Sequence, residues 1–207
     1  MAKKEIPMNR LQQFLPPGAY ETVHYYLQLH KVHLTIARER KTVLGDYRHR
    51  TGYSNHRISV NGNMNPYAFL ITLLHELAHL LVYELHGNKV QMHGMEWKKI
   101  YGLLLGEFIR KKIFPADVES ELLLSLKNPA ASSCAEDGLI RVLRKYDEGK
   151  NGCRLIEELP PHSLFRIGNG AIFKRGEKQR KRYKCTEVKT GKIYLFSPVY
   201  EVEMIEG

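Results

Sequence analysis

The 207-residue chain is poor in cysteine, and its start carries no secretory signal. Cys134, Cys153 and Cys185 are odd in number and widely spaced, and no C-x-x-C pair is present. These features exclude a disulfide framework and an ordinary zinc ribbon, and they favour a reducing compartment. Because residues 1–7 lack an apolar segment, we expect a cytoplasmic protein.

The composition is otherwise that of an ordinary globular protein, with 43% hydrophobic and 26% charged residues. The sequence shows neither internal repeats nor low-complexity tracts. The 32 basic residues outnumber the 22 acidic ones, which gives a formal net charge of +10. A chain with this charge attracts polyanions.

The longest apolar run covers residues 66–86 and has the length of a transmembrane helix. Four ionisable residues interrupt it: His75, Glu76, His79 and Glu84. Charge in the middle of a membrane is costly, so we expect no membrane association and a buried core helix instead. Asn65 is suited to cap the start of this helix and Gly87 to end it.

Within this helix, the pattern His75-Glu76-Leu77-Ala78-His79 indicates a metal site. Two histidines four residues apart on a helix share one face, with about 5–6 Å between their Cβ atoms. Both imidazoles can therefore bind one tetrahedral Zn²⁺, while Glu76 can reach a water at the open position of the metal. Ionisable groups in an apolar core are costly unless they bind a metal or one another. We therefore predict one zinc ion here.

His93 and Glu96 compete as the third ligand. His93 opens a second amphipathic helix, with apolar residues at i, i+3, i+4 and i+7 spacing. If this apolar face packs on the first helix, His93 turns toward the metal. The spacing and the ligand preference of zinc favour His93 over Glu96. His86 lies too far along the helix axis to join the same tetrahedron.

Four short segments carry a family resemblance: Gly45-Asp46-Tyr47-Arg48, Ile58-Ser59-Val60-Asn61, Leu73-Leu74-His75-Glu76-Leu77-Ala78-His79 and His93-Gly94-Met95-Glu96-Trp97. Together they resemble the SprT-like (SprT/Spartan) zinc metalloprotease family over roughly residues 10–110. The resemblance implies an α+β fold with a zincin-like metalloprotease domain, in which a small sheet accompanies the active-site helices. Matched residue by residue, it makes His75, His79 and His93 the zinc ligands and Glu76 the general base.

This set of residues predicts a zinc metallopeptidase acting on a protein or peptide substrate. Three neutral histidines leave the fourth zinc position open, and zinc lowers the pKa of a bound water toward about 7. Glu76 then accepts the proton from that water. The group that stabilises the tetrahedral oxyanion is left open among four residues: His49, Tyr53, His56 and Tyr83.

We expect the metalloprotease domain to span residues 1–127, with a further module at 128–207. The patterns predict helices over 19–29, 93–112, 118–126 and 139–146, and strands over 32–36, 42–48 and 57–60. Many zinc proteases bind an extended substrate as one more strand of such a sheet. The family resemblance implies the same role here.

The segment after Leu164 is rich in β signals and predicts a small module of β-hairpins. Many SprT-like proteins carry a four-cysteine zinc ribbon after the protease domain. This chain departs from that pattern, so we expect a degenerate zinc-ribbon-like module in which apolar packing replaces the metal.

One predicted hairpin of this module is strongly basic, with Lys174, Arg175, Lys178, Arg180, Lys181, Arg182 and Lys184 opposed only by Glu177. We predict that these cations bind nucleic acid, with Phe173 and Tyr183 available to stack on bases. The association of the family with DNA-bound substrates favours DNA over RNA.

The leading hypothesis is therefore a zinc peptidase acting on DNA-associated proteins. The alternative is a nucleic-acid-binding or transcription-associated factor with a structural or silent zinc site. Glu76 favours the enzyme, because a structural site has no need of a base beside an open position.

Overall fold

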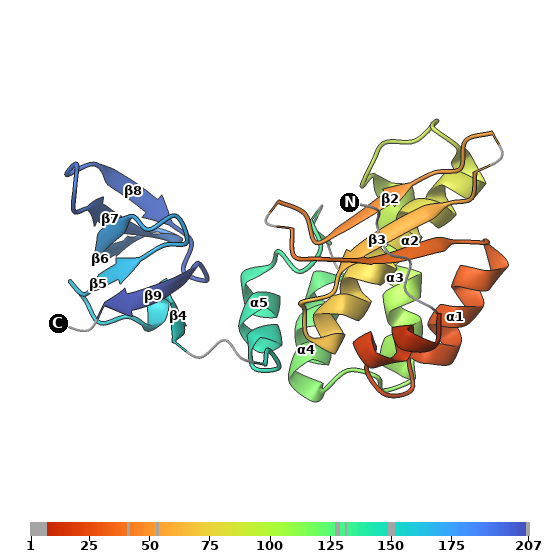
Figure 1. Cartoon of the computed structure of the whole chain (residues 1–207), viewed down its shortest axis with the longest axis horizontal. Helices are drawn as coiled ribbons and strands as arrows, with labels where there is room; N and C mark the ends of the chain where they lie inside the picture. Colours follow the sequence, from red (N-terminus) through yellow and green to blue (C-terminus); the bar gives the residue numbers. More distant parts are fainter. Residues whose placement is uncertain are drawn as a thin grey trace. The chain divides into compact units, whose positions relative to one another are not determined.

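The computed structural model describes residues 8–40, 42–52, 54–126, 129–130, 132–148 and 152–205. The chain divides into two compact units, Met1–Asp147 (unit 1) and Glu148–Gly207 (unit 2) (Figure 1). We expected the boundary between residues 127 and 128. It falls after Asp147 because helix α5 (Asp137–Arg144) packs on α4 (Ala116–Ser125) and so belongs to unit 1.

Unit 1 has mixed α and β structure. Besides α4 and α5, its elements are η1 (Met8–Phe14), α1 (Tyr20–Leu29), β1 (His33–Ala37), β2 (Gly45–Arg48), β3 (Arg57–Asn61), α2 (Pro66–His86) and α3 (Met95–Arg110). The three strands form one sheet in the order β1-β3-β2, with β1 parallel and β2 antiparallel to β3. Strand β2 is therefore an edge strand.

Strand β2 is shorter than the strand predicted over 42–48. The backbone carbonyls just before it accept hydrogen bonds from the side chains of Asn61 and Arg40. The Val43 carbonyl accepts a hydrogen bond from Asn61 Nδ2 at 3.0 Å. The Leu44 carbonyl accepts one from an Arg40 guanidinium nitrogen at 3.3 Å. The arginine thus joins the segment before β2 to the neighbouring strand β3.

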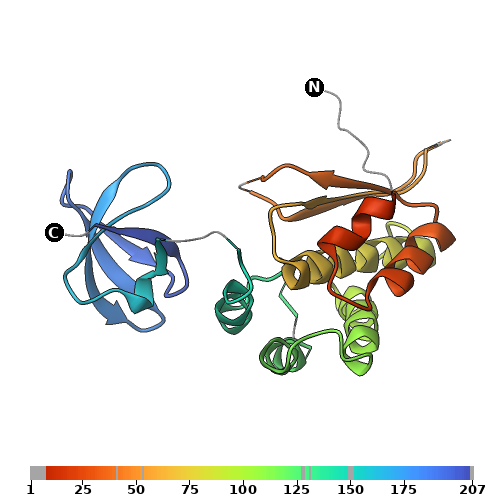
Figure 2. The same cartoon turned by 60° about the horizontal axis from the view of Figure 1, so that its bottom comes forward.

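Helix α2 has the predicted ends. The Asn65 side chain accepts a hydrogen bond from the Ala68 amide at 2.9 Å, and Gly87 ends the helix with a φ of +59°. Among the described residues only this helix is long and apolar enough to cross a membrane, yet 72% of its most apolar window is buried inside the protein. It lies between the sheet on one side and α3 on the other (Figure 2). It is the core helix of unit 1.

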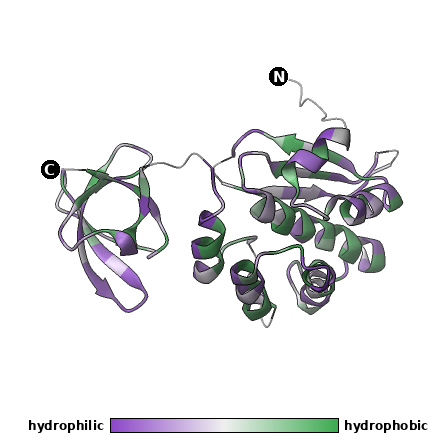
Figure 3. Ribbon diagram, turned by 90° about the horizontal axis from the view of Figure 1, so that it is seen from below, coloured by the Kyte–Doolittle hydropathy of each residue, from purple (hydrophilic) through white to green (hydrophobic). Residues whose placement is uncertain are grey.

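Unit 2 is larger than the predicted hairpins. Its elements are β4 (Cys153–Leu155), η2 (Ile156–Glu158), β5 (Leu164–Arg166), β6 (Ile172–Gln179), β7 (Arg182–Glu187), β8 (Ile193–Phe196) and β9 (Glu201–Ile205). The strands form one antiparallel sheet in the order β4-β9-β5-β6-β7-β8. Figure 3 shows the sheet curled round a common axis.

A separate hydrophobic core fills unit 2. Its fully buried members include Ile156, Phe165 and Cys185, each completely or almost completely shielded from solvent. Phe165 stacks on Phe173, and Phe196 packs edge-on against both rings. Aromatic packing and Cys185 therefore form the interior of this unit.

Candidate metal centre

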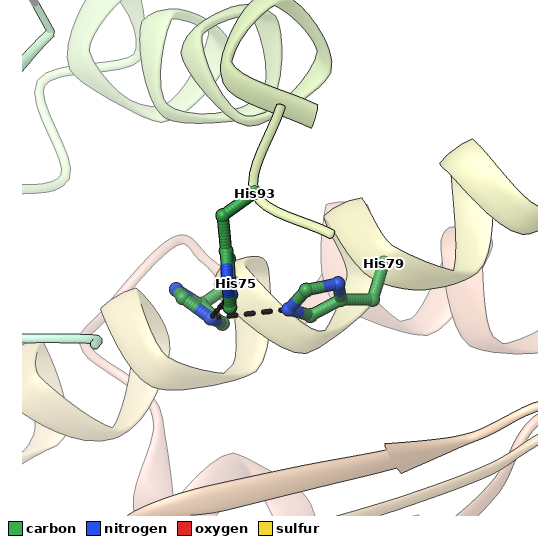
Figure 4. A group of neighbouring side chains, drawn as sticks. All are labelled: His75, His79 and His93. Atoms are coloured by element: carbon green, nitrogen blue, oxygen red, sulfur yellow. Dashed lines mark hydrogen bonds between the residues drawn. The ribbon is translucent and has the colours of Figure 1, made fainter. Parts of the chain in front are cut away.

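Three histidine rings converge on one point in unit 1 (Figure 4). The Nε2 atom of His75 lies 3.2 Å from Nε2 of His79 and 3.2 Å from Nε2 of His93. Tetrahedral zinc with Zn–N bonds of about 2.0–2.1 Å places two ligand nitrogens about 3.4 Å apart. The spacing of the three nitrogens therefore fits one tetrahedral zinc ion.

The backbone conformation of His93 brings it to the other two histidines. His75 and His79 lie one turn apart on α2, whereas His93 precedes α3 and has a φ of +57°. A non-glycine residue in this left-handed region is uncommon, although histidine adopts it more readily than most residues. Gly94 follows it as the N-cap of α3, and a Cβ there would lie 2.8 Å from the Gln91 carbonyl oxygen.

The predicted helix from His93 thus begins at Met95, and His93 itself lies in the connection between α2 and α3. Among the described residues, the group close enough to share a metal consists of His75, His79 and His93. Glu96, the competing third ligand, is not part of that group.

Burial keeps the clustered imidazoles uncharged. Burial and the other two histidines lower the pKa of His75 to about 3, and burial together with His93 lowers that of His79 to about 4. Burial also lowers the pKa of His93. With their protons on Nδ1, the neutral imidazoles would direct Nε2 lone pairs toward one another at 3.2 Å, an arrangement that a cation between them would stabilise.

Trp97 forms the floor beneath the three histidines. Its ring centroid lies 4.6 Å from that of His75, 5.4 Å from that of His79 and 4.8 Å from that of His93. Its side chain is 1% exposed, so it shields one side of the site from solvent. Trp97 belongs to the segment His93–Trp97 that carries the family resemblance, but its packing against all three rings was not predicted from the sequence.

Glu76 lines the cleft into which the histidines face. This cleft has a volume of about 560 Å³, and its walls include Glu76, the three histidines and the segment that leads into β2. The Glu76 side chain is almost fully buried, and burial, with a smaller contribution from Asp46, raises its pKa to about 8. Arg40 acts in the opposite direction. A nearby divalent cation would also lower this pKa, because it favours the ionised carboxylate.

Strand β2 passes so close to Glu76 that only glycine fits. A Cβ atom on Gly45 would lie 2.5 Å from Oε1 of Glu76 and 2.9 Å from Cγ2 of Thr72. The absence of a side chain at Gly45 therefore lets the edge strand lie directly against the carboxylate. Neither this contact nor the effect of Asp46 was predicted from the sequence, since both depend on how β2 packs on α2.

Tyr47, two residues after Gly45 on β2, packs against the histidine cluster. Its ring is parallel to that of His79, with 6.5 Å between the centroids. Its hydroxyl lies 2.8 Å from Nδ1 of His56, and Nε2 of His56 lies 3.1 Å from Oε1 of Glu84. With the proton on Nε2, His56 donates to the Glu84 carboxylate and accepts from the Tyr47 hydroxyl. This chain of hydrogen bonds fixes the end of β2 to the C-terminal half of α2.

Three of the four residues considered for stabilising the oxyanion already make contacts with other side chains. His56 is buried and engaged at both ring nitrogens. His49 stacks on Tyr83, with 4.5 Å between the ring centroids. Tyr53 lies outside the described residues.

These features define a class of site in which two histidines and a glutamate from one helix meet a third histidine beside an open cleft. Residues 18–108 match the model of the SprT-like family, and the SprT-like classification made from the sequence is thereby confirmed. This segment contains the three histidines, Glu76 and strand β2. Neither the curated proteins nor the solved structures include a significant match to the chain.

The basic residues predicted to bind nucleic acid lie on β6, β7 and the turn between them. Six of the seven are exposed: Lys174, Lys178, Arg180, Lys181, Arg182 and Lys184. Arg175 does not lie on this exposed face. It is buried, its guanidinium lies 4.4 Å above the Tyr183 ring, and its Nε donates to the Ile156 carbonyl at 3.2 Å.

The two aromatic residues of this hairpin also point inward. Phe173 is 3% exposed and Tyr183 is 8% exposed, and both belong to the core of unit 2. The predicted stacking of these rings on bases is therefore not available. The reason is the strand period of two, which places Phe173, Arg175, Tyr183 and Cys185 inside and the alternating lysines outside.

Proposed function

We propose that the chain is a zinc-dependent metallopeptidase. The observation that carries this proposal is the placement of Glu76 in the same cleft as three Nε2 atoms at zinc-ligand spacing. A metal site with three protein ligands and an accessible fourth position is the arrangement found in catalytic zinc sites. The match to the SprT-like family over residues 18–108 supports the same activity.

His75, His79 and His93 would hold the metal. When bound, zinc supplies Lewis acidity toward a carbonyl and lowers the pKa of water. Glu76 would take the proton from the attacking water and return it to the leaving amine. Burial raises the pKa of Glu76 to about 8 in the metal-free fold, and a bound divalent cation would lower it, so that the carboxylate can accept a proton near pH 7 and return it afterwards.

The edge strand would bind the substrate. The segment leading into β2 and the strand itself, through Tyr47, line the cleft beside the histidines. Because β2 is bonded to β3 on one side only, its other edge can accept an extended peptide by main-chain hydrogen bonds. Such a peptide would cross the metal centre with its carbonyl near the open position.

The direct test is hydrolysis of an unfolded protein by the chain with and without zinc. We expect a chelator to abolish cleavage and a stoichiometric amount of Zn²⁺ to restore it. Cleavage products are measured by mass spectrometry, and Glu76→Gln purified in the same way controls for a contaminating protease. A zinc-loaded chain that binds one metal ion yet cuts no peptide bond would support the structural-site alternative.

We further propose that the exposed cations of the β6–β7 hairpin bind DNA. The supporting observation is that six basic side chains remain exposed on one hairpin while the aromatic residues are buried. With no ring of this hairpin available for stacking, binding would rest on phosphate contacts and depend strongly on salt. This attraction would bring the peptidase to proteins held on DNA.

We expect Arg180→Ala with Lys181→Ala and Arg182→Ala to weaken binding to duplex DNA. Each lost phosphate contact reduces the slope of log K against log salt by about 0.9, so the triple variant should lose between about one and three units of slope. Fluorescence anisotropy at several salt concentrations measures this.

The matched control removes three exposed cations elsewhere in unit 2, with Arg154→Ala, Lys189→Ala and Lys192→Ala. Two of these residues lie in the turn at the opposite end of β7. An equal loss of affinity in both triple variants would mean that net charge, and not this hairpin, attracts the DNA.

A further inference from the structure

A second pocket lies beside the metal centre. It has a volume of about 230 Å³ and shares Tyr47, His79 and His93 with the larger cleft. Its remaining walls come from the C-terminal half of α2, the connection to α3, Trp97 of α3 and His49 just after β2. The pocket therefore lies next to two of the three histidines, and its lining does not include Glu76.

The walls of this pocket combine apolar and aromatic side chains with polar ones, among them His49, Asn88 and Gln91. Among the described residues that line it there is no aspartate, glutamate, lysine or arginine. Val82 and Val90 contribute aliphatic surface, and Tyr83 and Trp97 contribute rings. A charged group entering here would lose water without gaining a partner of opposite charge, whereas an apolar group would be favoured.

The volume fits one large side chain. An apolar cavity of about 150 Å³ is known to hold a benzene molecule. At about 230 Å³, the pocket has room for a phenyl ring or a branched aliphatic group. Glycine or alanine would leave most of it unfilled.

Hydrogen bonds and stacking hold the walls in place. Tyr47 is fixed through His56 to Glu84, and His49 stacks on Tyr83. Trp97 is packed against the histidines and is 1% exposed. A pocket formed in advance selects among side chains, because little ordering is required when one enters.

We infer that this pocket is the specificity subsite of the proposed peptidase and takes a neutral aromatic or branched apolar side chain next to the cleaved bond. The inference rests on the proposed function. A peptide paired with β2 would send a side chain past Tyr47 into the pocket, since alternate residues of an extended chain point to the same face. The chain would therefore prefer unfolded segments that expose apolar residues.

Cleavage of a peptide library by the zinc-loaded chain tests this directly. We expect Phe, Tyr, Leu or Ile at one of the two positions flanking the cut, with at least about tenfold higher kcat/KM than for Ala. Aspartate, glutamate, lysine and arginine should be depleted at the same position. Cleavage with no preference at either flanking position would overturn the inference.

Asn88→Glu changes the pocket without touching the metal ligands. Asn88 is exposed and lines this pocket but not the larger cleft. The new carboxylate should make lysine and arginine acceptable at the selected position. Leu85→Glu is the matched control, because Leu85 is 70% exposed near the end of α2, shortly before Asn88 in the chain, and lines neither pocket. Its cleavage profile should equal that of the native chain.

Binding measurements separate this inference from the proposed function. Calorimetry on the zinc-loaded chain would compare a peptide hydroxamate bearing a benzyl group with one bearing a carboxymethyl group. Tighter binding of the benzyl compound without any peptide cleavage would leave the subsite standing and reject the peptidase. Peptide cleavage without side-chain preference would reject the subsite and leave the peptidase standing. No peptide cleavage, together with no tighter binding of the benzyl compound, would reject both proposals.

Discussion

Glu76→Gln should reduce peptide hydrolysis by roughly 10²–10⁴-fold while the chain still binds one zinc ion. Glutamine keeps the size of the side chain but cannot take a proton from water. The three imidazoles that would hold the metal are unchanged by the substitution. The measurement is kcat/KM on a cleaved peptide, with zinc content determined by elemental analysis on the same samples.

The stability of the metal-free protein provides the control for folding. The pKa of Glu76 is raised from 4.5 to about 8 in the folded chain, so between these values the unfolded carboxylate is ionised while the folded one retains its proton. The contribution of Glu76 to the stability of the native fold therefore falls as the pH rises from about 4.5 to 8.

Glutamine removes this pH-dependent cost. The metal-free Glu76→Gln variant should thus exceed the native chain in free energy of unfolding by roughly 1–3 kcal/mol at pH 8, with little difference at pH 4.5. An inactive variant that is stable and still binds zinc would establish Glu76 as the base. Unchanged zinc-dependent cleavage would reject that role.

His93→Ala should abolish tight zinc binding. The substitution leaves two helix histidines and removes the Nε2 atom that lies 3.2 Å from that of His75. Loss of a group that merely supports a ligand costs about 10–100-fold in metal affinity, so loss of a ligand should cost more than about 100-fold. Metal content by elemental analysis and titration with a competing chelator measure the effect.

Thermal unfolding gives an independent readout. A ligand at 100 times its Kd stabilises the fold by about 2.7 kcal/mol, so zinc should raise the Tm of the native chain and leave that of His93→Ala almost unchanged at the same concentration. Glu96→Ala is the matched control, since Glu96 is close in sequence but outside the histidine cluster. Zinc binding lost in Glu96→Ala and kept in His93→Ala would reverse the ligand assignment.

The sequence by itself determined the local structure around the site. Residues 66–86 form the predicted helix with both expected ends, because N-cap, proline and glycine signals are local in the chain. His75 and His79 share a face for the same reason, since the helical repeat fixes their spacing. The β6–β7 hairpin also follows the predicted pattern, because the alternation of its side chains is local in the chain.

Tertiary structure alone decided which residues meet. The choice of His93 over Glu96 depends on a left-handed backbone conformation and on the packing of α3 against α2. The contact of Gly45 with Glu76, the position of Tyr47 and the boundary after Asp147 arise from packing between elements that are separate in the chain. Arg175 is buried because its strand faces a core that closes only when all six strands of unit 2 pair. Local patterns fix how a segment folds, whereas contacts between distant segments depend on the packing of the whole unit.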